Sequence, residues 1–245
     1  MIRLLASVKD ESEAQLALDG GADLIDFKNP AQGALGALAP DVIASGLRRL
    51  AGRALTSATA GDWPLQPAVL IEAVQRTGET GVDYVKLGML PGAALEACVE
   101  ALAPLALRYR IVAVFFADRG VPAGALNQVS AAGFAGAMVD TFDKRGGGLR
   151  QHLSDNRLRA FVEESRNLGL LTGLSGSLDL ADIAPLARMS PGLLGFRGAL
   201  CHAGARASTL SLERVQRVRA KLDASSVRVQ AGLASDLEYG RPARH

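Results

Sequence analysis

The chain has 245 residues, of which 49% are apolar and 4% aromatic, and its formal net charge is +2. A charge so near zero, with the arginines scattered along the chain, excludes the broad basic field typical of proteins that bind nucleic acid. No apolar run is long enough to cross a membrane, so we expect neither a membrane nor a nucleic acid as partner. The two cysteines, Cys98 and Cys201, lack metal-site spacing and, with no signal-peptide pattern, indicate the reducing cytoplasm.

Short apolar runs alternate with helical patterns along the chain. The predicted strands cover residues 2–8, 24–27, 54–59, 84–87, 111–116, 136–139, 171–174 and 193–196. The predicted helices cover residues 11–19, 40–50, 67–78, 93–107, 123–132, 155–168, 180–189 and 212–222, and several end at a glycine just before the next strand. Eight strand–helix units predict a single (β/α)8 TIM barrel over residues 1–222, with an open doubly wound sheet as the alternative. Residues 223–245 are predicted to form an appended, poorly ordered tail.

Residues 23–30 read DLIDFKNP, which places two charged side chains in a predicted strand. Because side chains alternate along a strand, Asp26 and Lys28 share one face, and Ile25 and Phe27 share the other. A closed parallel barrel has no edge strand, so the apolar face covers the helix side and the charged face points into the lumen. Barrel enzymes carry their catalytic groups at the C-terminal ends of the strands. The motif therefore predicts that Asp26 and Lys28 belong to an active site.

Two further strands end with a charged residue. Lys86 lies at the end of the fourth predicted strand, and Asp140 directly follows the sixth. Alternate strands of a barrel contribute one layer of lumen side chains, so these residues are expected to meet the charges of the second strand. This expectation depends on register, since a shift by one residue would turn the side chains outward. The alternative is a set of salt bridges that plugs the barrel, although buried ion pairs are weak sources of stability.

Two lysines in one confined site indicate amine chemistry. A free lysine has a pKa of about 10.4, so few lysines are neutral at pH 7. A second ammonium nearby and partial desolvation lower the pKa and produce an amine that can form a Schiff base with a carbonyl. We expect the aspartates to orient the amines and to transfer protons.

The loops after the last two predicted strands resemble phosphate-binding loops. The seventh strand leads into Gly176 and Ser177, and the eighth into Arg197 and Gly198. Barrels often bind phosphate at this position through backbone N–H groups and a helix N-terminus. Arg197 is expected to add a bidentate contact. The alternative is that small residues occupy these loops for steric reasons alone.

Other residues near the predicted strand ends leave two interpretations open. Thr59 and Asp62 either line the same mouth or form a helix-capping turn. Residues 118–119 are more typical of a solvated turn, and His202 is more typical of a surface residue than of a catalyst. The glycines at 146–148 form either a lid over the site or a plain connector.

Together, the segments DLIDFKNP, GALGA, SATAGD, YVKLG, MVDTFDK, GLSGS and FRGALC resemble the (5-formylfuran-3-yl)methyl phosphate synthases of methanofuran biosynthesis. The resemblance runs from about residue 2 to residue 222. It implies a TIM barrel that condenses two molecules of glyceraldehyde 3-phosphate into a furan aldehyde phosphate, with release of phosphate and water. It implies a phosphorylated triose as the small-molecule partner and no cofactor or metal. Whether the chain forms a homo-oligomer stays open.

The resemblance also implies roles for particular residues. Lys28 matches the lysine taken as the Schiff-base residue, and Lys86 matches the proton acceptor. Asp26 and Asp140 fall on acids of the active-site motifs, and Lys144 lies where the family carries another basic residue.

The chain departs from the family pattern in two places. Residues 201–208, CHAGARAS, lack the CKGGDR-like pattern of archaeal members, and the connection after Ala117 is shorter. Both departures concern substrate contacts and leave the two lysines in place. The Ala- and Arg-rich composition adds the expectation of a bacterial one-carbon pathway.

Two other functions agree with the same residues. A simple Schiff-base aldolase acting on a small phosphosugar would use the same lysines but would release no inorganic phosphate. A non-catalytic barrel that binds a sugar phosphate would form no imine that borohydride could reduce.

Overall fold

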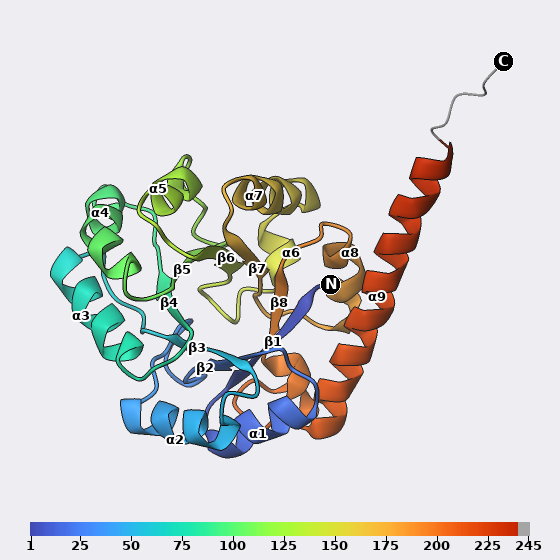
Figure 1. The fold of residues 1–245 in the computed structure, drawn as a ribbon, viewed down its shortest axis with the longest axis horizontal. Helices are drawn as coiled ribbons and strands as arrows, with labels where there is room; N and C mark the ends of the chain where they lie inside the picture. The colour runs from blue at the N-terminus through green and yellow to red at the C-terminus, as the bar shows by residue number, and fades with distance from the viewer. Residues whose placement is uncertain (240–245) are drawn as a thin grey trace.

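The eight strands close into one barrel in the computed structural model, which describes the backbone of residues 1–239 and the side chains of residues 1–225. Every strand pairs in parallel with its neighbours in the sequence, and β1 also pairs with β8. Figure 1 shows the strands as an inner ring with the helices around it. The predicted TIM barrel is confirmed, and the closed strand order excludes the open doubly wound sheet.

The elements lie close to their predicted positions. The strands are β1 (Arg3–Val8), β2 (Leu24–Phe27), β3 (Leu55–Thr59), β4 (Tyr84–Gly88), β5 (Ile111–Phe116), β6 (Gly136–Asp140), β7 (Leu171–Leu174) and β8 (Leu193–Phe196). The helices are α1 (Glu11–Asp19), α2 (Pro40–Leu50), α3 (Pro67–Gly78), α4 (Leu95–Ala106), α5 (Ala125–Ala131), α6 (Leu149–His152), α7 (Asp155–Asn167), α8 (Leu180–Ala187) and α9 (Leu212–Tyr239). The sequence did not predict α6 or the short 3-10 turns η1 (Gly198–Leu200) and η2 (His202–Gly204).

The side chains of β2 separate into two layers, as the alternation predicts. Ile25 and Phe27 lie in the apolar layer between the strands and the helices. Phe27 packs against Gly46 of α2, where a Cβ atom would come within 2.3 Å of the ring. Leu24 faces the other way, into a lumen cluster formed by Leu5, Leu24, Ala34, Leu35, Val112, Val114, Phe116, Met138 and Leu193. Asp26, two residues further along the same face of the strand as Leu24, therefore lies on the lumen side.

The loop after β2 folds back over the mouth of the barrel. Its Leu35 is fully buried in the lumen cluster. Thr59 Oγ1 donates to the carbonyl of Gly36 at 2.8 Å, and the Asp62 carboxylate accepts from the Leu35 backbone N–H at 3.0 Å. Thr59 and Asp62 thus hold this loop in place, which is neither of the two interpretations that the sequence left open.

The last helix is longer than predicted. It packs beside α8 and continues to Tyr239, past residue 222 where the sequence placed its end (Figure 1). The poor order of residues 223–245 stays a prediction, and residues 240–245 lie outside the described part of the chain. Among the helices that the structure describes, none is long and apolar enough to span a membrane.

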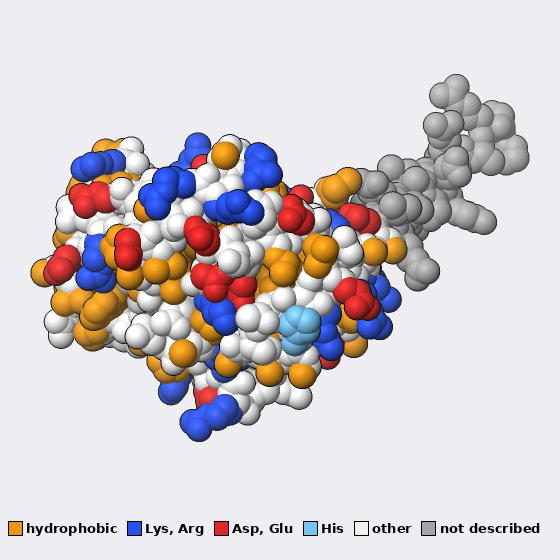
Figure 2. Space-filling model, turned by 90° about the horizontal axis from the view of Figure 1, so that it is seen from below, with side chains coloured by type: hydrophobic (Ala, Val, Ile, Leu, Met, Phe, Trp, Pro, Cys, Tyr) orange, Lys and Arg blue, Asp and Glu red, His pale blue; other side chains and the backbone are white. Residues whose placement is uncertain are grey.

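The surface carries charges of both signs. On the face seen in Figure 2, Lys and Arg side chains are interspersed with Asp and Glu side chains, and no broad field of one sign covers this face. This distribution agrees with the small net charge of the chain.

Candidate active site

A cavity of about 690 Å³ opens where the barrel strands end. Eight of the predicted site residues line its wall: Lys28, Lys86, Asp140, Lys144, Gly176, Ser177, Arg197 and Gly198. The ninth, Asp26, is fully buried and forms an ion pair with Lys86. The predicted convergence of these residues at the barrel mouth is therefore confirmed, while their roles stay predictions.

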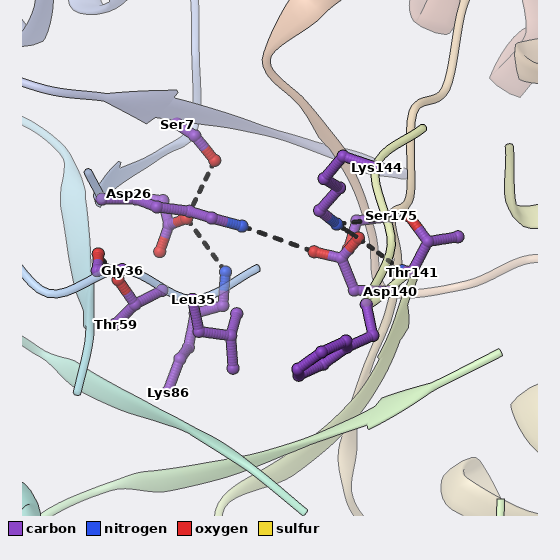
Figure 3. A network of polar contacts seen from close by, with 12 residues as sticks. Ser7, Asp26, Leu35, Gly36, Thr59, Lys86, Asp140, Thr141, Lys144 and Ser175 are labelled. Carbon is purple, nitrogen blue, oxygen red and sulfur yellow. Dashed lines mark hydrogen bonds and ion pairs between the residues drawn. The ribbon is translucent and has the colours of Figure 1, made fainter. Parts of the chain in front are cut away.

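The deeper part of the site is built around Asp26 (Figure 3). The register of the strands sets Ser7 of β1 and Ser57 of β3 on either side of Asp26. Both hydroxyls donate to the carboxylate, at 2.9 Å from Ser7 and 2.6 Å from Ser57. The Lys86 ammonium donates to the same carboxylate at 2.9 Å. A buried carboxylate with three donors is well compensated, so this pair is a rigid part of the site.

The upper part of the site is built around Asp140, which two lysines share. Lys144 lies four residues further along the chain and donates to one carboxylate oxygen and to the Thr141 hydroxyl. Lys28 reaches the other oxygen across the lumen, at the long distance of 3.5 Å. The backbone N–H of Thr141 adds a contact of 2.7 Å. Lys28 is therefore held only loosely, although just 7% of its surface is exposed.

The environment of Lys28 increases the share of the neutral amine. Burial lowers the pKa of Lys28 from 10.5 to about 8, and the neighbouring ammonium groups of Lys144 and Lys86 act in the same direction, against the carboxylates of Asp140 and Asp26. A pKa of about 8 leaves roughly one molecule in ten with a neutral Lys28 at pH 7. Asp140 behaves in the opposite way: burial alone would raise its pKa, but Lys144 and Lys28 hold it well below its usual range.

The loop that carries Lys144 is held by residues after β5. The Asp118 carboxylate accepts from the backbone N–H groups of Phe142 and Asp143, at 2.6 and 2.9 Å. The Arg119 guanidinium lies 4.8 Å from the centre of the Phe142 ring. Residues 118–119 lie in a turn in which Arg119 is exposed, as predicted, and Asp118 and Arg119 in addition anchor the loop after β6.

The segment 146–148 leads directly into α6. The backbone N–H of Leu149 donates to the Gly176 carbonyl at 2.9 Å, which ties the start of α6 to the loop after β7. The segment is thus a connector that ends in a fixed contact, and its role as a lid stays a prediction.

The loops after β7 and β8 line the cavity and contain backbone N–H groups without a partner in the described part of the chain. Gly176 has a φ of +119°, and a Cβ atom there would come within 3.0 Å of Thr141 Cγ2, so the turn requires glycine. Ser177 also adopts a positive φ, of +50°. The backbone N–H groups of Gly176, Ser177 and Gly198 donate to no acceptor in the described part of the chain. Free N–H groups in such a turn favour an anion.

Arg197 lines the cavity but uses its guanidinium elsewhere. Two of its nitrogens bind the carboxylate of Glu13, a buried residue of α1. Its remaining N–H groups donate to the carbonyls of Ser7, Arg206 and Ser208, at 3.1, 2.8 and 2.8 Å. All five N–H groups are therefore occupied. This geometry argues against the predicted phosphate contact of Arg197 and makes it a residue that positions the loop after β8.

The sequence pattern of the 4-HFC-P synthase family matches residues 4–219, which covers the barrel and this site. The chain belongs to the 4-HFC-P synthase family. A Methylorubrum extorquens protein named as a candidate (5-formylfuran-3-yl)methyl phosphate synthase is 43% identical over 87% of this chain and 88% of its own length. The (5-formylfuran-3-yl)methyl phosphate synthase of Methanopyrus kandleri is 36% identical over 83% of this chain and 91% of its own length.

Solved structures show the same fold at low sequence identity. A phosphoribosyl anthranilate isomerase from Thermus thermophilus matches with a TM-score of 0.64 and 16% identity, over 91% of this chain and 99% of that one. A 3-keto-L-gulonate-6-phosphate decarboxylase from Vibrio cholerae matches with a TM-score of 0.65 and 15% identity, over 93% of this chain and 98% of that one. These likenesses concern the fold alone.

Four residues of this site were not predicted from the sequence. Ser7 and Ser57 bind Asp26. The sequence feature that could have indicated them is a serine at a strand position that faces the lumen. Arg206 and Arg214 line the cavity, but they follow the last strand in a loop and in the last helix, where the sequence placed no site residue. His202 is exposed, as predicted.

Proposed function

We propose that the chain condenses two molecules of glyceraldehyde 3-phosphate to (5-formylfuran-3-yl)methyl phosphate, as an aldolase-like lyase of methanofuran-type cofactor biosynthesis. The names of its relatives support an enzyme of furan phosphate formation. The observation that carries the proposal is a buried lysine with a lowered pKa facing a second buried lysine across one cavity. Such a pair provides an amine nucleophile and a separate base.

Lys28 is the nucleophile in this proposal. Its pKa of about 8 and its single long contact with Asp140 leave the neutral amine accessible from the cavity. The amine adds to the aldehyde carbon of one triose phosphate, and loss of water gives an iminium. Lys144 lies beside the reacting nitrogen, is oriented by the Asp140 carboxylate, and supplies the proton that the leaving hydroxyl requires.

Lys86 is the base that converts the iminium into an enamine. Lys86 Nζ donates to the Asp26 carboxylate at 2.9 Å, and transfer of this proton to Asp26 gives the neutral amine that acts as the base. The enamine carbon then attacks the aldehyde of the second triose phosphate. Elimination of one phosphate, release of the lysine by water, ring closure and dehydration give the furan. Two triose phosphates thus lose one phosphate and two waters in total, and no oxidant or reductant is needed.

The free backbone N–H groups of Gly176, Ser177 and Gly198 support binding of a substrate phosphate. They lie on the cavity wall with Lys28. A phosphate held there would orient the triose aldehyde toward the amine, which is how a remote group contributes to catalysis.

Borohydride reduction in the presence of glyceraldehyde 3-phosphate tests the proposal. Mass spectrometry of the digested protein is expected to find the triose adduct on Lys28, and parallel assays to find inorganic phosphate and a furan chromophore. An adduct without phosphate release would support the simple aldolase instead. Absence of any adduct under turnover conditions would contradict both the furan phosphate synthase and the simple aldolase. A barrel that binds a sugar phosphate without catalysis would then be the remaining function.

A further inference from the structure

Arg206, in the loop after β8, lines the cavity and leaves most of its donors unused. Its Nη2 donates to the carbonyl of Gly33, in the loop after β2, at 3.2 Å. Its Nε and Nη1 donate to no acceptor in the part of the chain that the structure describes. The guanidinium is half-buried, and its burial lowers its pKa, while Asp140 and Asp62 attract it and Arg197 repels it.

Other residues fix the backbone of Arg206 in this position. Arg197 Nε donates to the Arg206 carbonyl at 2.8 Å. Arg197 is itself held by the buried carboxylate of Glu13. Arg206 therefore extends from a braced loop across the cavity mouth to Gly33, rather than from a free surface segment.

Most other cations of the cavity wall already have a carboxylate partner. Lys86 pairs with Asp26, Lys28 and Lys144 share Asp140, and Arg197 pairs with Glu13. Among the described residues of the wall, Arg206 and Arg214 make no such ion pair. An arginine at a cavity wall whose guanidinium keeps unpaired N–H groups is suited to bind two oxygens of one phosphate.

The guanidinium of Arg206 contacts a different loop from the one that carries Gly176 and Ser177. These two residues belong to the loop after β7, whereas Arg206 reaches from the loop after β8, which it shares with Gly198, to the loop after β2. In the closed strand order, β7 is followed by β8, β1 and β2, so the loops after β7 and β2 face the cavity from different sides. A cavity that takes two phosphorylated trioses needs two such elements.

We propose that Arg206 forms a second phosphate-binding site, which holds the phosphate of the second triose while the backbone N–H groups hold that of the first. This inference rests on the proposed function for the identity of the substrates. One edge of the guanidinium binds two phosphate oxygens, through the second N–H of Nη2 and an N–H of Nε or Nη1, while the first N–H of Nη2 keeps its contact with the loop after β2. The site thus selects a phosphorylated aldehyde as the second substrate.

Binding of inorganic phosphate to the full-length chain, measured by titration calorimetry, tests the proposal without turnover. The wild type is expected to bind two phosphates, and Arg206→Gln one, with the second site weakened by at least about tenfold. Arg206→Lys keeps the charge but loses the planar group that binds two oxygens, so the second site should be weakened less than in Arg206→Gln. Arg217→Gln, which removes an exposed arginine of α9, should bind two phosphates like the wild type.

Three results would overturn the assignment. A wild type that binds one phosphate has no second site, and an Arg206→Gln variant that binds two with unchanged affinity does not use Arg206. Loss of the second site in Arg214→Gln but not in Arg206→Gln would transfer the role to Arg214. Borohydride trapping of a triose on Lys28 should need the same triose concentration in Arg206→Gln as in the wild type. If neither protein traps a triose on Lys28, while the wild type still binds two phosphates and Arg206→Gln one, the proposed reaction is rejected. The phosphate site at Arg206 is then retained.

Discussion

Lys28 and Lys86, two of the three lysines that line the cavity, differ in how their carboxylates hold them. Asp26 is fully buried, accepts from two serine hydroxyls and binds Lys86 at 2.9 Å. Asp140 accepts from Lys144 and from a backbone N–H, and it binds Lys28 only at 3.5 Å. The first arrangement is a closed ion pair, and the second leaves one cation with little compensation for its burial.

This difference shows how one barrel prepares two equal side chains for different tasks. Burial penalises the charge of a lysine unless a partner compensates it, and burial lowers the pKa of Lys28 to about 8. The sequence presents both lysines at the ends of similar strands, so the distinction comes from the geometry of their partners. The substitutions below test it, from the largest expected effect to the smallest.

Lys28→Arg should remove furan phosphate formation, by on the order of 10⁴-fold or more, while the fold persists. Arginine keeps the positive charge opposite Asp140, but a guanidinium stays protonated and cannot form an imine. Turnover and circular dichroism are the measurements. A variant that still makes the product at near the wild-type rate would show that Lys28 acts by its charge, and Lys86 would become the candidate for the imine.

Asp26→Asn should lower the free energy of unfolding by about 3–5 kcal/mol, because Lys86 is left buried without an anion. Urea denaturation measures the loss. The double substitution Asp26→Asn with Lys86→Met is the control, since it removes the stranded charge and should regain most of the stability. If the single variant is as stable as the wild type, the closed ion pair contributes less than its geometry indicates.

Lys28→Met should be inactive but more stable than the wild type, by about 3 kcal/mol at pH 7. The pKa of Lys28 falls from 10.5 to about 8 on folding, so the folded protein disfavours the ammonium. The penalty is fully present below pH 8 and disappears as the pH rises toward 10.5, where the unfolded chain also loses the proton. The stability difference between variant and wild type should therefore shrink over this range, and a constant difference would contradict the linkage.

Asp140→Asn should move the formation of the Lys28 adduct to lower pH. The Asp140 carboxylate raises the pKa of Lys28, so its removal leaves burial and the neighbouring ammonium groups to lower that pKa further. The pH profile of borohydride trapping measures the shift, while turnover should fall by about 10–100-fold through loss of proton transfer. A profile that stays in place, or moves to higher pH, would contradict the coupling between Lys28 and Asp140.

Much of the site follows from short-range patterns. Alternation along residues 24–28 sets Asp26 and Lys28 on the lumen face, because Ile25 and Phe27 occupy the helix side. Repeated strand–helix units predict the barrel, and the barrel brings the strand ends together. These features depend on neighbouring residues in the chain, so a single sequence contains them.

The tertiary structure alone decided which polar groups are free to bind a ligand. Arg197 looks like a phosphate ligand in the sequence, but Glu13, 184 residues away, occupies its guanidinium. Asp118 lies in a turn, as the sequence predicted, and only folding shows that it also anchors the loop that carries Lys144. Arg206 is the converse case, since most of its guanidinium N–H groups stay unpaired at the cavity wall in the described part of the chain. The sequence determined the barrel, the lysines and their acids through local alternation, whereas the availability of each donor depends on partners that only folding brings within hydrogen-bonding distance.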